Sequence, residues 1–240
     1  MRWYIHLSLF CCICGQYLSL CSQNIPSVLY TAVEVSVPLG DFAKDDYNLE
    51  QYGMADIGMV LSVQFQFPIG QRWGMNVRLM HSAWFTDPSA LEKIIEERDG
   101  KASAGVNGWT STAFLVGPYG LLPLNRNNTL IFYYRILIGA AYSTSPDFEI
   151  NSGMNYENEN VINGGSGTDP AVQVGIDLRY DFSNFLSFLT FASYYYTNTT
   201  VDGIENSMEP GLNPLSITMP IMAFNFGIGL GLILNGQRVR

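Results

Sequence analysis

The sequence predicts an all-β fold: an eight-stranded antiparallel transmembrane up-and-down β-barrel with long extracellular loops and short periplasmic turns. Three observations predict it. Eight segments alternate apolar and polar residues, the links between them alternate long and short, and only three lysines occur among 240 residues. Charged residues make up 14% of the chain, against about 25% in soluble domains. Because a membrane barrel carries its apolar parity outside, we expect these strands to present their apolar residues to lipid.

The eight expected strands are 28–37, 56–70, 75–85, 108–119, 130–142, 171–182, 185–196 and 221–234. Each has about ten residues or more, enough for a tilted strand to cross a bilayer. Segment 171–182 shows the period of two most clearly, with Val172, Val174 and Ile176 on one parity and Gln173 and Asp177 on the other. Segment 185–196 is apolar on both parities, so its facing stays open.

The links sort by length and by charge. Links 39–53, 86–107, 143–169 and 197–216 are long and polar, whereas "PIGQRWG", "LLPLNRNN" and "FSN" are short. Strict alternation gathers the long loops at one rim and the tight turns at the other, as in outer-membrane barrels. Seventeen of the 21 acidic residues lie in the long loops. An outer rim this acidic argues against nucleic acid as a partner.

Residues 1–22 have the layout of a secretory signal peptide, with one positive residue, Arg2, before an apolar run. Cleavage near Ser22 leaves residues 23–240 as the barrel domain, and lipidation at Cys21 is the alternative, although the preceding Leu20 is larger than usual there. All four cysteines lie in this segment. The mature chain therefore has no disulfide and no thiol nucleophile, and the sequence predicts no cofactor and no metal centre.

Seven charged residues are expected to point into the lumen: Glu34, Asp56, Arg78, Arg135, Asp177, Arg179 and Asp181. The interior of an eight-stranded barrel is just wide enough for side chains to fill. Four acids and three arginines in that space must pair, because an unpaired buried charge is costly. The pattern favours a salt-bridged plug, and a proton- or ion-selective path is the alternative.

The single mature histidine, His81, falls on the apolar parity near the outer rim. Lipid-modifying barrel enzymes place a histidine and a serine at this level, and Ser82 and Ser111 are the conceivable partners. Ser82 has the opposite parity, and no acid is spaced to orient the imidazole. A rim histidine without a catalytic role is the favoured interpretation.

Two long loops carry further candidates. Residues 87–100 resemble a short helix with Asp87 or Ser89 as cap, packing over the barrel mouth or docking a partner. Loop 143–169 holds five carboxylates that could bind a cation, namely Asp147, Glu149, Glu157, Glu159 and Asp169. Their spacing matches no calcium-loop pattern, so a solvated loop is favoured.

Four stretches carry a resemblance to a known family: "VPLGDF" (37–42), "FLVGPYGLLPL" (114–124), "LIGAAYSTSP" (137–146) and "NFGIGLGLIL" (225–234). They resemble the small outer-membrane β-barrel, or porin-family, proteins of Bacteroidetes, whose architecture is related to OmpA, OmpX and OmpW. Many such barrels end on an aromatic residue, whereas this chain runs on through "NGQRVR".

The resemblance implies an integral outer-membrane protein of a Gram-negative cell, in contact with outer-membrane lipid and lipopolysaccharide. The expected role is a non-enzymatic barrel with a plugged lumen, either a structural or binding protein or an accessory subunit of an envelope complex. Its acidic loops would then contact another envelope protein or lipopolysaccharide-bound cations. A narrow channel for small or apolar solutes is the second hypothesis, and a lipid-modifying enzyme is the third.

Overall fold

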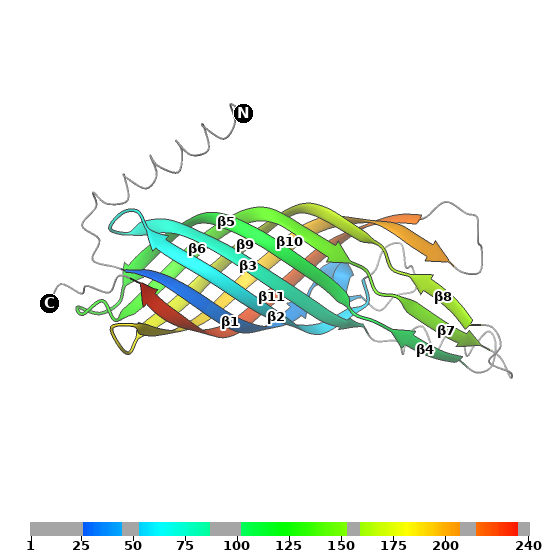
Figure 1. Ribbon diagram of the computed structural model, residues 1–240, viewed down its shortest axis with the longest axis horizontal. Helices are drawn as coiled ribbons and strands as arrows, with labels where there is room; N and C mark the ends of the chain where they lie inside the picture. The colour runs from blue at the N-terminus through cyan, green and yellow to red at the C-terminus, as the bar shows by residue number, and fades with distance from the viewer. Residues whose placement is uncertain (1–25, 45–52, 87–101, 153–158, 207–214, 235–240) are drawn as a thin grey trace, which may run out of the picture.

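Figure 1 shows the computed structural model, in which tilted strands form one closed ring. The structure describes residues 26–44, 53–86, 102–152, 159–206 and 215–234. The leader 1–22, the expected helix 87–100 and Glu157 lie outside these ranges. The ring contains β1 (Ser27–Pro38), β2 (Ala55–Pro68), β3 (Trp73–Thr86), β5 (Trp109–Pro123), β6 (Leu130–Thr144), β9 (Ser166–Asp181), β10 (Leu186–Asn206) and β11 (Leu215–Leu234).

Neighbouring strands of the ring pair antiparallel in chain order, and β1 closes it by pairing with β11 from Ser27↔Leu234 to Pro38↔Ala223. The predicted fold class, an eight-stranded up-and-down barrel, is therefore confirmed. Closure satisfies the backbone hydrogen bonds of every strand with its two neighbours, which is the condition for a sheet to exist within lipid. Within the described residues no helix is long and apolar enough to cross a membrane.

The barrel is apolar outside and polar inside. On β2, Leu61 is 55% exposed, whereas Gln64 is 1% exposed. The same alternation decides the facing of β10, which the sequence left open. Leu189, Phe191, Ser193 and Tyr195 are buried in the interior, and the residues that alternate with them are less buried and face outward. The outer wall is thus the apolar band of an integral membrane barrel.

Three further strands extend one end of the ring: β4 (Ala102–Val106), β7 (Phe148–Ser152) and β8 (Glu159–Asn163). β8 continues the sheet from the end of β10 through Glu205↔Asn163, β7 pairs with β8, and β4 pairs with β7. We expected a loop over 143–169, whereas β7 and β8 are paired strands within it. Five-residue strands carry little periodicity of their own, and their order comes from pairing with distant segments.

The two ends of the barrel differ (Figure 1). The turns that join β2 to β3, β5 to β6 and β9 to β10 lie together at one end, and the β4–β7–β8 extension lies at the other. In the β5–β6 turn, the Asn125 side chain accepts hydrogen bonds from the backbone N–H groups of Thr129 (2.9 Å) and Leu130 (3.2 Å). At the extension end, the short 3-10 helix η1 (Gly40–Ala43) follows β1 and packs against β11 and β2.

Candidate functional site

The lumen is the candidate functional site, because the inward parity of every strand delivers polar side chains to it. Its charged side chains within the described residues are three arginines and three acids, each at most 4% exposed: Arg78, Arg135, Arg179, Glu34, Asp177 and Asp181. Opposite charges are therefore equal in number. Such balance allows every buried charge to have a partner, which is required because these side chains are withdrawn from bulk water.

The first ion pair joins β1 to β3, across the strand β2 that lies between them. The Arg78 guanidinium on β3 donates from Nη2 to the Glu34 carboxylate on β1. Ser62, on the intervening strand β2, donates to Glu34 Oε1 at 2.9 Å and accepts from Arg78 Nη2 at 3.1 Å. A hydroxyl is thus shared by both charged groups, which fixes the geometry of the pair.

The second ion pair joins β6 to β9, where Arg135 donates from Nη1 to Asp177. Gln66, from the far side of the ring on β2, donates to Asp177 Oδ2 at 3.5 Å. The two arginine pairs share an aromatic neighbour, since the Phe191 ring lies 5.4 Å from Arg78 Cζ and 5.7 Å from Arg135 Cζ. Cation–π contacts in a desolvated site add to the attraction of each pair. The middle of the lumen is therefore crossed by linked charged groups.

The third ion pair lies within β9 and toward the turn end. Arg179 holds Asp181 with two bonds, Nε to Oδ1 at 2.6 Å and Nη2 to Oδ2 at 2.9 Å. The remaining nitrogen, Nη1, donates to the Tyr133 hydroxyl at 2.9 Å. The period of two places these residues on one face, so the fork geometry of arginine can engage the carboxylate with both oxygens.

Asp56 does not belong to this group, and its expected lumenal position is wrong. The register of β2 with β3 shifts between Ala55 and Gly58, so Asp56 and Ile57 are both exposed on the outer wall. The Asp56 carboxylate accepts a hydrogen bond from the Ile57 N–H at 2.6 Å. A β-bulge adds one residue to a strand and reverses the facing beyond it, which a strict period of two does not anticipate.

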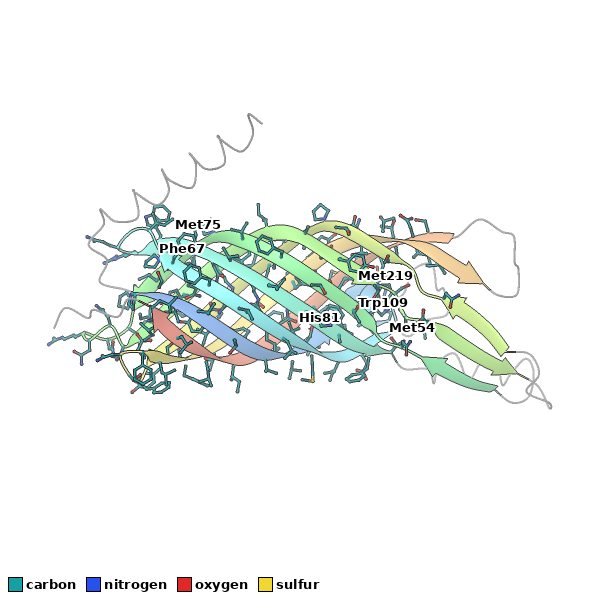
Figure 2. The ribbon with its side chains drawn as sticks, viewed as in Figure 1. Met54, Phe67, Met75, His81, Trp109 and Met219 are labelled. Atoms are coloured by element: carbon teal, nitrogen blue, oxygen red, sulfur yellow. The ribbon has the colours of Figure 1, made fainter. Side chains whose placement is uncertain are left out.

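Two apolar clusters lie in the lumen on either side of the linked Arg78 and Arg135 pairs, and sequence reasoning missed them. At the extension end, the buried Phe42 ring of η1 lies 5.1 Å from the Trp84 ring and 5.7 Å from the Trp109 ring, with edge-on geometry. Figure 2 shows Trp109 near this end, together with the buried Met54 and Met219.

The polar ends of both indoles are satisfied: Trp84 Nε1 donates to Ser36 Oγ at 2.8 Å, and Trp109 Nε1 donates to the Gly53 carbonyl at 2.6 Å. At the turn end, Tyr119 packs edge-on against Tyr133 at 5.4 Å between ring centroids. A signal for the first cluster was present in the sequence, since the apolar Phe42 lies only four residues after the end of the first strand at Pro38. Nothing local shows that it turns back inside.

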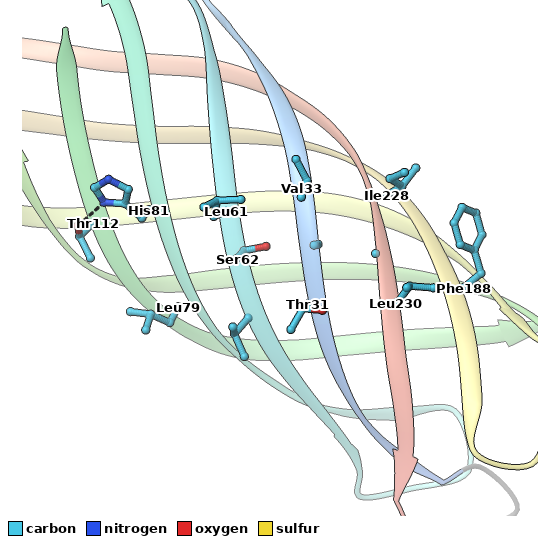
Figure 3. A pocket seen from close by; sticks show the side chains of 13 residues that line it. Thr31, Val33, Leu61, Ser62, Leu79, His81, Thr112, Phe188, Ile228 and Leu230 are labelled. Atoms are coloured by element: carbon cyan, nitrogen blue, oxygen red, sulfur yellow. Dashed lines mark hydrogen bonds between the residues drawn. The ribbon is translucent and has the colours of Figure 1, made fainter. Parts of the chain in front are cut away.

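His81 is exposed on the outer parity of β3, opposite to the buried Arg78, and Figure 3 shows it beside Thr112. Its Nδ1 lies 2.9 Å from Thr112 Oγ1 on β5, beside a shallow groove lined mainly by apolar residues. Ser82 and Ser111, the conceivable catalytic partners, are buried on the lumenal side. The structure therefore brings neither serine to the histidine, and the groove residues include no carboxylate.

The carboxylates of the expected loop cation site are held apart in the described structure. Asp147 accepts from the Gly164 N–H at 2.7 Å and from Asn107 Nδ2 at 3.1 Å, whereas Asp169 accepts from the Thr200 N–H at 2.9 Å. Of the other members, Glu149 lies in β7, Glu159 lies in β8 and Glu157 lies outside the described ranges. No three His, Asp or Glu side chains gather within the part of the chain that is described. The cation site stays a prediction.

No protein-family model and no curated protein matches this sequence. Among solved structures, the chain is similar to Ail, the attachment invasion locus protein of Yersinia pestis, with 12% identity, 86% of this chain and 99% of that chain covered, and a TM-score of 0.43. It is similar to the outer membrane protein AlkL, with 16% identity, coverage of 89% and 92%, and a TM-score of 0.46.

A third similar structure is a major outer membrane protein from Thermus thermophilus, with 11% identity, coverage of 86% and 99%, and a TM-score of 0.46. Identities this low carry no information about ligand or activity. The closed ring, its apolar outer band and its polar interior are features of this chain itself. By those features it is an integral β-barrel of the bacterial outer membrane.

Proposed function

We propose that this protein is a non-enzymatic outer-membrane barrel with a closed lumen, acting as a structural or binding protein or as an accessory subunit of an envelope complex. One observation carries the proposal: the lumen is filled in layers. Linked ion pairs cross its middle, the aromatic cluster around Phe42 covers the extension end, and Tyr119 and Tyr133 cover the turn end. A solute entering from the extension end meets packed rings before it meets the charges, and one entering from the turn end meets the Arg179–Asp181 pair together with the two tyrosines.

The extension beyond the ring supports a binding role. Of the strands that the structure describes, β4 pairs with β7 alone and is the outermost strand of the extension. An edge strand is a template for pairing with a strand of another protein. In the outer membrane this end carries the acidic loops, where we propose contact with an envelope protein and with lipopolysaccharide-bound cations.

Planar-bilayer conductance tests the closed lumen. We expect the refolded wild-type chain to give no discrete openings. Heat-modifiable gel mobility shows beforehand that each protein is folded. Discrete wild-type openings that vanish in Arg78→Met or Arg135→Met would contradict the proposal, because current would then pass through the charged layer.

The second candidate is a narrow channel for small or apolar solutes, and one observation favours it. The side-chain amides of Gln64, Asn76 and Asn225 are buried in the lumen, and neither atom of any of these amides has a hydrogen-bond partner within the described residues. Buried amides of this kind are normally satisfied by ordered water or by a polar ligand. Wild-type openings altered by Gln64→Leu, with the ion pairs intact, would favour the channel over the closed barrel.

A further inference from the structure

An open groove of about 630 Å³ lies on the outer wall at the extension end of the barrel. It runs over the ends of four strands and over the links to β4, β7 and β8. Its lining is mostly polar and includes Asn107, Thr110, Tyr142, Asp147 and Asp202. The volume is within the ~300–1,000 Å³ range of small-molecule sites. Nothing in the proposed closure of the lumen uses this groove.

The charge of the groove limits what can bind there. Among the described residues that line it, Asp147 and Asp202 are the only charged ones, and no Lys, Arg or His is present. Two carboxylates with no cationic side chain beside them repel phosphate, sulfate and nucleotides, so the groove disfavours these anions. The few apolar atoms disfavour an acyl chain. The groove therefore favours an uncharged or cationic ligand with many hydroxyl groups.

Fixed hydrogen-bonding groups already face such a ligand. Asp147 is held by the Gly164 N–H at 2.7 Å and by Asn107 Nδ2 at 3.1 Å. The hydroxyl oxygens of Thr110 and Thr144 lie 2.6 Å apart. Groups held in place before binding lose little freedom when a ligand arrives.

Glycines contribute much of the backbone that lines the groove. Gly108, Gly164, Gly165 and Gly203 all belong to its lining. Gly203 has φ +86°, and a Cβ built on it would meet nothing within 4 Å, so the space beside it is free. A Cβ on Gly165 would lie 2.3 Å from the Asp202 carbonyl oxygen, so this close approach requires glycine. The Gly164 N–H donates to Asp147 at 2.7 Å and the Gly165 N–H donates to Ser145 Oγ at 2.9 Å, so these two glycines hold the lining in place, and the open space lies beside Gly203.

Tyr142 supplies the aromatic side chain of the groove. It is 50% exposed and lines the groove from the end of β6. A flat aromatic face beside carboxylate, amide and hydroxyl groups matches the two sides of a pyranose ring, whose C–H face is apolar and whose edge carries hydroxyls. We propose that this groove binds an uncharged or amino sugar. The inference rests on the proposed binding role and names its ligand class.

Calorimetric titration of the full chain, refolded in phospholipid nanodiscs, tests the groove. The probes are chitotriose, its de-N-acetylated amino form and a sulfated trisaccharide. We expect one of the first two to bind and the sulfated one not to bind. Tyr142→Ala and Asp202→Asn are each expected to weaken binding at least tenfold. The matched controls are Tyr180→Ala, an equally exposed tyrosine on β9, and Asp56→Asn, and both should bind as the wild type does.

Failure of both unsulfated probes to bind, or binding that survives Tyr142→Ala and Asp202→Asn, would overturn the inference. Nanodiscs containing lipopolysaccharide separate the two sources of sugar. Loss of trisaccharide binding in them identifies the cell's own glycolipid as occupant, and undiminished binding identifies a soluble or foreign glycan. A barrel that binds no sugar and conducts no current refutes this inference alone, whereas discrete openings refute the closed lumen alone.

Discussion

Replacing Arg78 by methionine is expected to destabilise the barrel by about 3–5 kcal/mol, the cost of leaving one partner of a buried ion pair without the other. Both side chains of the Arg78–Glu34 pair are 0% exposed, so solvent does not screen the lone carboxylate. Ser62 still donates to Glu34 at 2.9 Å, which places the expected loss toward the lower end of that range.

Urea unfolding of the chain in lipid vesicles, followed by tryptophan fluorescence, measures this loss as a change in midpoint at constant slope. Adding Glu34→Gln to Arg78→Met removes the unpaired charge and should recover roughly 2 kcal/mol, so the two changes are not additive. The matched control is Lys44→Met, which breaks the exposed pair between Lys44 and Asp41 and should cost less than about 0.5 kcal/mol. Equal losses for Arg78→Met and Lys44→Met would refute a desolvated charged layer.

Three further predictions follow from the packing. Phe42→Ala removes the edge-on contacts with Trp84 and Trp109 and should lower the free energy of unfolding by about 3–5 kcal/mol. It should also raise quenching of the tryptophan fluorescence by acrylamide, whereas Phe85→Ala on the outer wall should leave the quenching unchanged. Asp177→Asn removes the charge that pairs with the buried Arg135 and should lower the urea midpoint, while Asp56→Asn on the outer bulge should change the free energy of unfolding by less than about 0.5 kcal/mol. Equal effects would contradict the outward position of Asp56. Asn125→Ala removes the acceptor that holds the β5–β6 turn and should cost about 1–2 kcal/mol in the same assay; an unchanged midpoint would show that the turn does not depend on this side chain.

Much of the site was predictable because its residues lie in long periodic strands. In β9, the alternation from Val172 onward requires Asp177, Arg179 and Asp181 to share one face, and the structure places all three inside. Glu34, Arg78 and Arg135 are inward for the same reason. Their partners were not predictable, since Glu34 meets Arg78 across an intervening strand. Pairing depends on the tilt and register of the closed ring.

Where local periodicity fails, only tertiary pairing decides the structure. Asp56 faces outward because a bulge between Ala55 and Gly58 shifts the register of β2 against β3. The facing of β10 follows from its pairing with β9 and β11, since both of its parities are apolar.

The sequence by itself determined that this chain is an inside-out barrel with a charged interior. The period of two, the alternation of long and short links and the scarcity of lysine can all be read from the sequence. Within a membrane, alternating strands satisfy their backbone hydrogen bonds only in a closed barrel. Only the tertiary structure decided what fills the extension end of the lumen, because Phe42 meets Trp84 and Trp109 through contacts distant in sequence. The polar groove likewise exists only where the ends of separate strands and links meet.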